Sequence, residues 1–254
     1  MKTKDRIRSN FSAAAPYYDQ YSLIQNKAAC DLISKIKDNG FLKILDIGCG
    51  TGNFTKYLQE KFPKAKITAL DISKEMVAQA KDKLNLGSLD FIVADAQDHC
   101  FKEKFDLISS NVSFQWFKNL DKTLAGYNKI LNSQGSIMFS IFGPDTFSEL
   151  QFTYNQYFKE SRLDASNFLS KENLKAIIKK YFPDFKVEEK NYQQNFDSLL
   201  KLLKNITYTG AGGLSLKNKK LWTHKTISKL EEIYLKKFKT IKASYQVFFV
   251  RARR

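Results

Sequence analysis

Apolar residues recur along this chain in short runs that alternate with longer amphipathic stretches. Seven runs have the length and character of buried strands, and they cover residues 44–47, 65–70, 89–94, 105–110, 136–142, 185–191 and 241–250. Helical spacing fills many of the segments between them, as in 53–62, 120–131 and 171–181. This alternation predicts an α/β fold, Rossmann-like, around a seven-stranded and mostly parallel sheet.

Three further helical segments lie outside this alternation. Residues 1–39 precede the first strand, while 145–161 and the lysine-rich 196–240 are insertions after the fifth and sixth strands. We predict one domain in which 41–142 is the ligand-binding core, 241–254 holds the last strand, and the three helical segments cover one edge of the sheet. The alternative is that the insertions only pad the face of the sheet.

A glycine-rich turn follows the first strand in the run Asp46-Ile47-Gly48-Cys49-Gly50-Thr51-Gly52. Glycines at a strand-to-helix turn let a ligand approach the backbone, and we expect their N–H groups to be free at the helix start. The third glycine comes one residue too early for a dinucleotide-binding motif, and no Gly-Lys-Ser/Thr follows for a phosphate loop. Asp46 favours a ligand with a cationic end, such as S-adenosylmethionine, over a phosphate. The alternative is a βα turn that binds nothing.

Polar residues follow the next three strands as well. Asp71 ends the second strand, roughly 20 residues past the glycines, where it can accept both ribose hydroxyls. Asp95 follows the third strand and can accept from the adenine amine, and Asn111 follows the fourth. Each residue alone could be an ordinary loop residue, but ligands of open α/β sheets bind at this edge. The pattern resembles that of the class I S-adenosylmethionine-dependent methyltransferases.

Composition indicates a folded core and suggests which kinds of partner the protein could bind. The chain has 43% hydrophobic residues, which is typical of a packed core, and a net charge of +16. Residues 151–254 contain 22 Lys/Arg against 9 Asp/Glu, and the rest contains 20 against 17. The basic C-terminal part indicates either compositional drift or an acidic partner, which could be a nucleic acid or a carrier protein.

Other classes of protein are disfavoured. No apolar stretch approaches the roughly 18 residues of a membrane span, and the polar N-terminus does not resemble a secretory signal. Three cysteines without C-x-x-C spacing predict free thiols in a cytoplasmic protein. With two histidines in the chain, we expect no metal site.

Longer motifs resemble one family over nearly the full chain, the malonyl-[acyl-carrier protein] O-methyltransferases of biotin synthesis. The similar segments are 10–19 (NFSAAAPYYD), 110–116 (SNVSFQW), 139–150 (FSIFGPDTFSEL), 167–170 (NFLS) and 244–249 (SYQVFF). The resemblance implies methyl transfer from S-adenosylmethionine to the free carboxylate of malonyl-acyl-carrier protein or malonyl-CoA. The ester then primes pimeloyl synthesis. It also implies an acidic carrier protein as partner, and we expect a monomer that binds neither nucleic acid nor membrane.

The motifs and the resemblance together assign candidate site residues. The predicted cofactor-binding residues are Gln25, Asp46, Gly48, Cys49, Gly50, Gly52, Asp71, Ile72, Met76, Asp95, Ala96, Asn111 and Val112. The predicted catalytic residues, which would line the acceptor site, are Tyr18, Gln115 and Trp116. Trp116 could instead be a core aromatic residue, and Tyr18 could be an ordinary helix-packing residue.

Two segments depart from the family pattern. Asn167 stands where members often have an arginine that could clamp the malonyl carboxylate, and Arg162 lies five residues upstream. Residues 209–213 also differ from the usual I-G-A-T motif. Two alternatives therefore stay open: a methyltransferase for another small carboxylic acid or metabolite, and a module that senses S-adenosylmethionine or binds nucleic acid.

Overall fold

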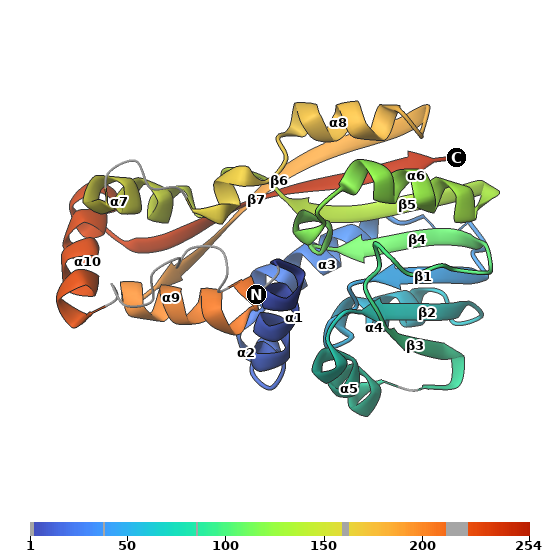
Figure 1. Cartoon of the computed structure of the whole chain (residues 1–254), viewed down its shortest axis with the longest axis horizontal. Coiled ribbons are helices and arrows are strands. Elements are labelled where there is room, and N and C mark those ends of the chain that lie inside the picture. The colour runs from blue at the N-terminus through green and yellow to red at the C-terminus, as the bar shows by residue number, and fades with distance from the viewer. Residues whose placement is uncertain (1–2, 38, 85, 159–162, 212–222) are drawn as a thin grey trace. The chain divides into compact units, whose positions relative to one another are not determined.

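The computed structural model describes residues 3–37, 39–84, 86–158, 163–211 and 223–254. The chain divides into two compact units, each assembled from three stretches of sequence. The first unit comprises Met1–Ile24, Phe142–Leu169 and Lys190–Val247. The second unit comprises Gln25–Ile141, Ser170–Glu189 and Phe248–Arg254. Figure 1 shows the ribbon with the labels used below.

A seven-stranded sheet runs through the described residues (Figure 1). Its strands are β1 (Lys43–Ile47), β2 (Lys66–Asp71), β3 (Leu89–Val93), β4 (Phe105–Asn111), β5 (Leu131–Phe142), β6 (Asp184–Phe196) and β7 (Ile241–Arg253). Their spatial order is β3-β2-β1-β4-β5-β7-β6, and the pairs from β3 to β5 are all parallel. The predicted α/β fold class is confirmed.

The order of the strands reverses between β1 and β4, which pair side by side although β2 and β3 lie between them in sequence. Every residue of β1 after Lys43 is buried, as expected for a strand that is covered by helices on both faces. Ligands of open α/β sheets bind outside the carboxyl ends of the strands at such a reversal. The fold therefore favours a site where β1, β2 and β4 end.

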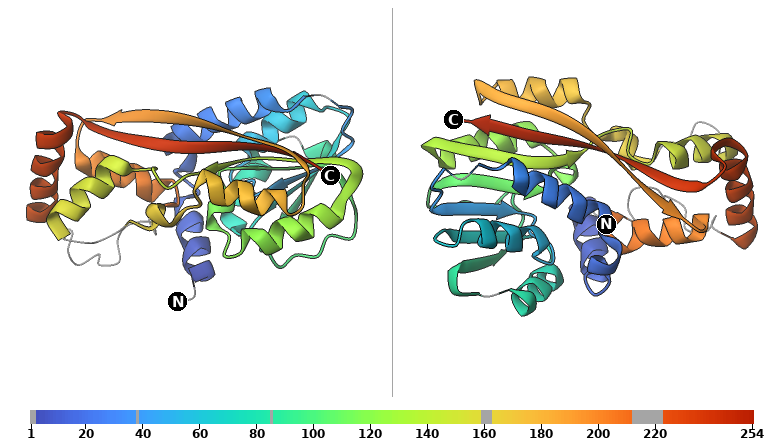
Figure 2. Two further views of the ribbon diagram at one scale, coloured as in Figure 1. Left: turned by 90° about the horizontal axis from the view of Figure 1, so that it is seen from above. Right: turned by 180° about the vertical axis from the view of Figure 1, so that it is seen from behind.

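Helices cover both faces of the sheet in the second unit. They are α3 (Leu23–Lys35), α4 (Asn53–Lys61), α5 (Lys74–Lys83), α6 (Leu120–Ile130) and α8 (Lys171–Lys179). The left view of Figure 2 shows α3 and α4 on one side of the strands and α6 and α8 on the other. Ser73 and Ser170 cap α5 and α8 through side chains that accept backbone N–H groups.

The first unit contains the helices that the sequence placed outside the alternation. They are α1 (Thr3–Ala14), α2 (Tyr18–Tyr21), α7 (Ser148–Phe158), α9 (Leu199–Tyr208) and α10 (His224–Phe238). The rings of Tyr17 and Tyr21 both lie against Tyr208 of α9, with centroids 4.9 and 4.7 Å away. In the same unit Phe152 of α7 meets Phe238 of α10 edge to face. Aromatic contacts therefore hold these helices together.

A buried carboxylate fixes the start of α7 to β7. Glu149 is 5% exposed, and its two oxygens accept hydrogen bonds from the hydroxyl and the N–H of Ser244, at 2.6 and 3.0 Å. Next to it, Phe147 donates its N–H to the Ser244 carbonyl from a left-handed backbone conformation. Residues 95 positions apart share this contact, so the start of the insertion after β5 is held in place by the last strand.

The predicted element boundaries hold better near the start of the chain than near its end. The two insertions contain α7, α9 and α10 as expected, although residues 159–161 and 212–222 lie outside the described residues. The sixth strand was predicted to end at 191 and in fact continues to Phe196. Its second half is rich in polar residues, so hydrophobicity alone did not reveal it.

The remaining expectations concern chemistry rather than shape. Cys30, Cys49 and Cys100 are all free thiols. In the part of the chain that the structure describes, no helix has the length and apolar character needed to cross a bilayer. Nor do three or more metal-ligating side chains gather at any point among those residues.

Gly210 should be intolerant of any side chain. Its φ is +73°, and a Cβ there would lie 2.3 Å from the ring of Phe11 in α1. We expect Gly210→Ala to lower the free energy of unfolding by at least about 2 kcal/mol. Gly126→Ala is the matched control, because Gly126 lies in α6 with open space around it and should gain about 0.5–1 kcal/mol. Urea unfolding measures both, and equal effects would contradict the Phe11 contact.

Candidate functional site

The predicted cofactor residues meet at the carboxyl ends of the parallel strands in the second unit. β1 leads into Gly48, β2 ends at Asp71, and β4 ends at Asn111. The register places Asp46 opposite Ser109 of β4, and Asp71 opposite Val93 at the end of β3. The sheet thus brings polar groups together that are separated by up to 65 positions in sequence.

The three glycines of the turn are required for different reasons. All have positive φ, at +70° for Gly48, +54° for Gly50 and +84° for Gly52. A Cβ on Gly48 would lie 2.1 Å from the Ser113 hydroxyl, and one on Gly52 would lie 2.8 Å from Leu84. A Cβ on Gly50 would meet nothing within 4 Å. Gly48 and Gly52 are therefore packing positions, whereas Gly50 borders open space.

The N–H groups of this turn are not free, which corrects the expectation from sequence. Gly48 and Cys49 both donate to the Leu70 carbonyl, at 2.7 and 3.0 Å. Gly50 donates to Asp71 Oδ2 at 2.9 Å, and Gly52 donates to the Cys49 carbonyl. The end of β2 supplies most of these acceptors, since it lies beside β1. The turn therefore offers a ligand its shape and its neighbouring acceptors rather than backbone donors.

Asp71 has a structural task as well as its predicted role. The residue is 8% exposed, and besides Gly50 it accepts the N–H of Ser73 at 2.8 Å. Burial raises the pKa of its carboxyl, while the N–H groups of Ser73, Gly50 and Ile72 oppose that rise. Each carboxylate oxygen has a second lone pair, so the two ribose hydroxyls of a nucleoside could still be accepted. That role stays a prediction.

Asp46 carries an unsatisfied acceptor. Its Oδ2 accepts the hydroxyl of Thr55 at 2.6 Å, and its buried Oδ1 has no hydrogen-bond partner among the described residues. Burial raises the pKa of this carboxyl to about 7, against the bond from Thr55 and with help from the charge of Asp71. A buried carboxylate with a spare oxygen suits a cationic ligand group.

Cys49 and Met76 lie below the surface of the turn. Cys49 packs against Ala69 and Val77, and burial with the neighbouring carboxylates raises the pKa of its thiol. It therefore stays protonated and is not a nucleophile. Met76 is 1% exposed and donates its N–H to the Ser73 hydroxyl. Its predicted role in cofactor binding stays a prediction, as does that of Ile72.

The loop after β3 is tied down by short-range bonds. Asp95 Oδ1 accepts the N–H of Gln97 at 2.9 Å. The carbonyl of Ala96 accepts the hydroxyl of Tyr127 from α6, and Ala96 is 7% exposed. The two predicted adenine-side residues are thus held in fixed positions at the sheet edge.

The end of β4 connects to the predicted N-terminal cover. Asn111 donates its side-chain amide to the carbonyl of Gln25 in α3 at 3.0 Å, so Gln25 does lie at this edge. Val112 follows with φ of 43°, and its carbonyl accepts the Gln115 side-chain amide at 2.5 Å. The other amide atom of Gln115, Oε1, is buried without a partner among the described residues. A ligand group that donates a hydrogen bond would satisfy it.

The two other residues predicted to line the acceptor site, Trp116 and Tyr18, lie in different parts of the fold. Trp116 closes a short 3₁₀ turn, Phe114–Trp116, and is partly buried rather than a core residue. Tyr18 begins α2 in the first unit, whereas the strand ends belong to the second. The catalytic roles of Tyr18, Gln115 and Trp116 stay predictions.

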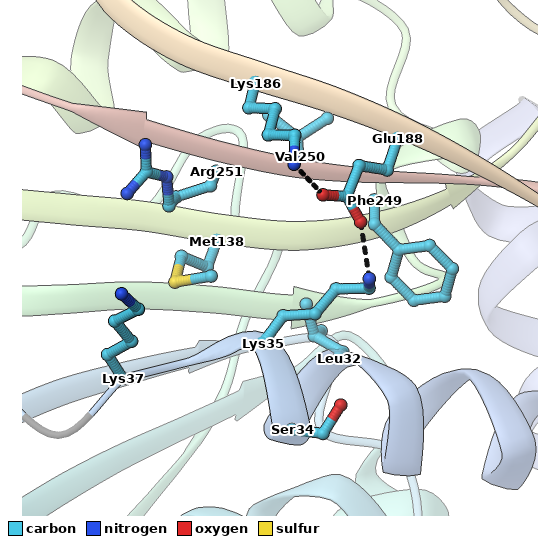
Figure 3. Close-up of a pocket in the computed structure, with 10 residues that line it drawn as sticks. All are labelled: Leu32, Ser34, Lys35, Lys37, Met138, Lys186, Glu188, Phe249, Val250 and Arg251. Carbon is cyan, nitrogen blue, oxygen red and sulfur yellow. Dashed lines mark hydrogen bonds and ion pairs between the residues drawn. The ribbon is translucent and has the colours of Figure 1, made fainter.

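A hollow of about 370 Å³ lies elsewhere in the second unit (Figure 3). It is lined by Leu32, Ser34, Lys35, Lys37, Met138, Lys186, Glu188, Phe249, Val250 and Arg251, none of them a predicted site residue. Figure 3 shows Glu188 bound by Lys186 on one side and Lys35 on the other. These lysines lower the pKa of Glu188 to about 2. The hollow is thus partly filled by its own ion pairs.

The residues at the sheet edge fit the predicted cofactor. S-Adenosylmethionine has an ammonium group, a sulfonium centre and ribose hydroxyls. The edge offers a buried carboxylate oxygen without a partner at Asp46, further acceptors at Asp71 and Asp95, and open space beside Gly50. The carboxylates accept hydrogen bonds and carry negative charge, which suits a cationic ligand that has no phosphate.

Sequence reasoning missed three hydroxyl side chains that support this edge. Thr55 binds Asp46, Ser113 packs on Gly48, and Ser140 binds both Asn111 and Val112. Serine and threonine are common in strands and helices, so their residue type gave no signal. Their partners became visible only through the register of β4 and β5 and the turn of α4.

Comparison with known proteins agrees with this geometry. Residues 44–135 match a family described as "Methyltransferase domain". The chain is 35% identical over 240 residues to malonyl-[acyl-carrier protein] O-methyltransferase 2 of Ilyobacter polytropus, covering 94% of this chain and 92% of that protein. It is 33% identical to the malonyl-[acyl-carrier protein] O-methyltransferase of Acetivibrio thermocellus, covering 100% of this chain and 95% of that one.

Solved structures share the fold at low identity. The YcgJ protein from Bacillus subtilis aligns with a TM-score of 0.62 at 15% identity, over 90% of this chain and 98% of its own. A Haemonchus contortus phosphoethanolamine N-methyltransferase 2 in complex with S-adenosyl-L-methionine aligns with a TM-score of 0.55 at 19% identity, over 92% of this chain and 55% of its own.

Cofactor affinity should increase with pH around neutrality, because Asp46 must ionise before it attracts a cation. Its carboxyl keeps a proton up to a pKa of about 7. At about pH 6.5, binding should therefore release most of one proton. Calorimetry in buffers of different ionisation enthalpy measures the release. The Asp46→Asn variant should bind weakly and release none, and a wild-type affinity that stays constant from about pH 6 to about pH 8 would contradict the assignment.

The same carboxyl supplies a control in the ligand-free protein. Its folded pKa of about 7 exceeds the ordinary value of 3.8, so its neutral form stabilises the fold at low pH. That contribution, on the order of 4 kcal/mol, is lost as the pH rises from about 4 to about 7. Asp46→Asn should remove this dependence, so the variant should gain stability relative to wild type at about pH 8.

Alanine substitutions at Gly50 and Gly48 should separate an effect on cofactor binding from an effect on the stability of the fold. Gly50→Ala adds a methyl group to open space, so beyond about 1–2 kcal/mol of backbone strain the fold should tolerate it. Cofactor affinity should fall at least about tenfold, since the methyl occupies space beside the acceptors. Gly48→Ala meets Ser113 and should lower the melting temperature much further. Normal cofactor affinity in Gly50→Ala would place the ligand elsewhere.

Proposed function

Since the chain belongs to the family of malonyl-[acyl-carrier protein] O-methyltransferases, we propose that it methylates the free carboxylate of a malonyl thioester on acyl carrier protein. The observation that carries the proposal is identity of 33–35% over nearly the whole length of these relatives. S-Adenosylmethionine is the methyl donor. We further propose that the product ester primes pimeloyl synthesis for biotin.

The reaction makes modest demands on the protein. When bound, the cofactor supplies an electrophilic methyl group on a sulfonium centre with a neutral thioether as leaving group. A carboxylate with a pKa near 4 is already ionised at neutral pH. It therefore needs no general base, and the protein contributes chiefly by holding donor and acceptor about 3–3.5 Å apart in line.

The site residues divide into two proposed groups. Asp46, Asp71 and Asp95 hold the donor by its ammonium, ribose and adenine groups, and Gly50 leaves room for it. Gln115, Trp116 and Tyr18 line the acceptor side, where the Gln115 amide can orient the malonyl group. Restricted motion and exclusion of water there would raise the rate without proton transfer.

One position favours a second candidate function. Asn167 is exposed in the short turn Asp164–Asn167, in place of the arginine that the family pattern often has. Arg162 lies outside the described residues. An amide binds a carboxylate more weakly than a bidentate guanidinium does. Methyl transfer to another small carboxylic acid is the alternative that this substitution supports.

A transfer assay separates the two candidates. Labelled S-adenosylmethionine is incubated with malonyl-acyl-carrier protein, malonyl-CoA, free malonate or a tricarboxylate. We expect the carrier-bound malonyl group to have the highest kcat/KM and the free acids to be nearly inert. Complementation of a biotin-requiring strain that lacks its own malonyl methyltransferase tests the same point in cells. Transfer to a free acid alone would overturn the malonyl proposal.

We also propose that the enzyme acts as a single-domain monomer in the cytoplasm, without binding nucleic acid or membrane. Its helical insertions would then serve as the cover over the methyl-transfer site. Support for a carrier protein comes from the surplus of 22 Lys/Arg over 9 Asp/Glu in residues 151–254. An acidic carrier is attracted by such an excess of positive charge.

Lysines of α10 should affect the KM for a substrate on the carrier protein and not the KM for a small thioester. Lys225 and Lys236 are exposed on this helix. Reversal of both to glutamate should raise the KM for malonyl-acyl-carrier protein about fivefold or more at low salt, and leave the KM for malonyl-CoA nearly unchanged. A double reversal at exposed Lys64 and Lys102 in the second unit changes the net charge equally and is the control. Equal effects of the two pairs would exclude a docking role for α10.

A further inference from the structure

Val112 has an unusual backbone at the cofactor edge. Its φ is 43°, in the left-handed region that β-branched residues rarely adopt. Such a conformation costs about 1–3 kcal/mol and persists only where the surroundings impose it. The residue is 8% exposed and directly follows Asn111 at the end of β4. Some neighbouring group must therefore hold it.

Ser140 holds the N–H of Val112 through both its hydroxyl and its carbonyl, and the Gln115 amide holds the Val112 carbonyl. β5 places Ser140 directly opposite Asn111. Ser140 Oγ accepts the N–H of Val112 at 3.0 Å and donates to Asn111 Oδ1 at 2.7 Å. The Ser140 carbonyl accepts the same N–H at 3.0 Å. Ser140 is fully buried, so water cannot replace its hydroxyl.

This bond also fixes which way the Asn111 amide faces. With Oδ1 turned to Ser140, the amide nitrogen points the other way and donates to the carbonyl of Gln25 at 3.0 Å. Gln25 lies in α3, the helix that leads into the second unit. The hydroxyl of Ser140 thus binds the strand end and the strained residue after it, and the Asn111 amide continues the chain of hydrogen bonds to Gln25 in α3.

We propose that Ser140 is a positioning residue of the cofactor site. It acts through Asn111 and Val112, and it makes no contact with the reacting groups itself. The inference rests on the proposed function, because it assumes that S-adenosylmethionine binds at this edge. Without the hydroxyl, the Asn111 amide loses its orienting donor, the Val112 backbone loses one of its two acceptors, and the edge samples other shapes before the cofactor binds.

Ser109 provides a matched control on the neighbouring strand. It is also fully buried, and its hydroxyl donates to the carbonyl of Met138, the residue opposite it in β5, at 2.7 Å. A change from serine to alanine removes the same buried hydroxyl in both cases. Ser109 lies two residues before Asn111, and its hydroxyl makes no bond to Asn111, Val112 or the glycine turn among those that the structure shows.

Cofactor binding to the two variants tests the proposal. In calorimetry with S-adenosylmethionine and S-adenosylhomocysteine, Ser140→Ala should raise the Kd about five- to tenfold, and Ser109→Ala should leave it within about twofold. Urea unfolding should show a loss of stability for both variants, larger for Ser140→Ala because its hydroxyl makes two hydrogen bonds and that of Ser109 makes one. In kinetics, Ser140→Ala should raise the KM for S-adenosylmethionine while kcat and the KM for the malonyl acceptor stay within about twofold.

Ser140→Thr and Ser140→Val keep the proposal testable if the alanine variant does not fold. The two side chains have nearly the same shape, and threonine alone keeps the hydroxyl. Threonine should bind the cofactor more tightly than valine by about fivefold. Equal affinities in both pairs would overturn the positioning role. Wild-type protein that binds no S-adenosylmethionine would overturn the proposed function instead, so the two failures can be told apart.

Discussion

The carbonyl of Leu70 and the carboxylate of Asp71 hold the turn after β1 in its shape. Together they accept the N–H groups of Gly48, Cys49 and Gly50. These hydrogen bonds join β1 and β2 at the point where both strands end, and α4 begins directly after this turn, at Asn53. Asp46, Thr55 and Ser113 take their positions relative to this turn. The residues that follow β4 pack closely on this turn, since a Cβ at Gly48 would lie 2.1 Å from the Ser113 hydroxyl.

The turn and the end of β2 bring two buried carboxyl groups close together. Asp46 and Asp71 are both nearly inaccessible, and burial raises the pKa of each carboxyl. Backbone N–H groups stabilise Asp71, whereas Asp46 has a single hydroxyl donor. Once ionised, Asp46 therefore carries an electrostatic cost of burial that a cationic ligand relieves. Because the Asp46 carboxyl is neutral below a pKa of about 7, ligand binding and its ionisation favour each other, and the cost of ionisation lowers the affinity at lower pH.

Local patterns predicted the parts of the fold in which neighbouring residues decide the structure. The turn from Asp46 to Gly52 follows from residue type and spacing, and the structure contains it after β1 with all three glycines at positive φ. Other features depend on partners far away in the chain. The engagement of the glycine N–H groups requires β2, and the bond between Glu149 and Ser244 requires the last strand. Neither partner could be identified before the topology was known.

The composition of the two units has a consequence for how the chain can be divided. It passes from one unit to the other five times, after residues 24, 141, 169, 189 and 247. Both β6 and β7 contribute residues to each unit. No single cleavage can release either unit as a continuous fragment, and removal of the segment after 247 takes β7 residues from the sheet. Duplication or exchange of one unit during evolution would therefore require several simultaneous joins, which favours change by substitution and loop insertion within an undivided chain.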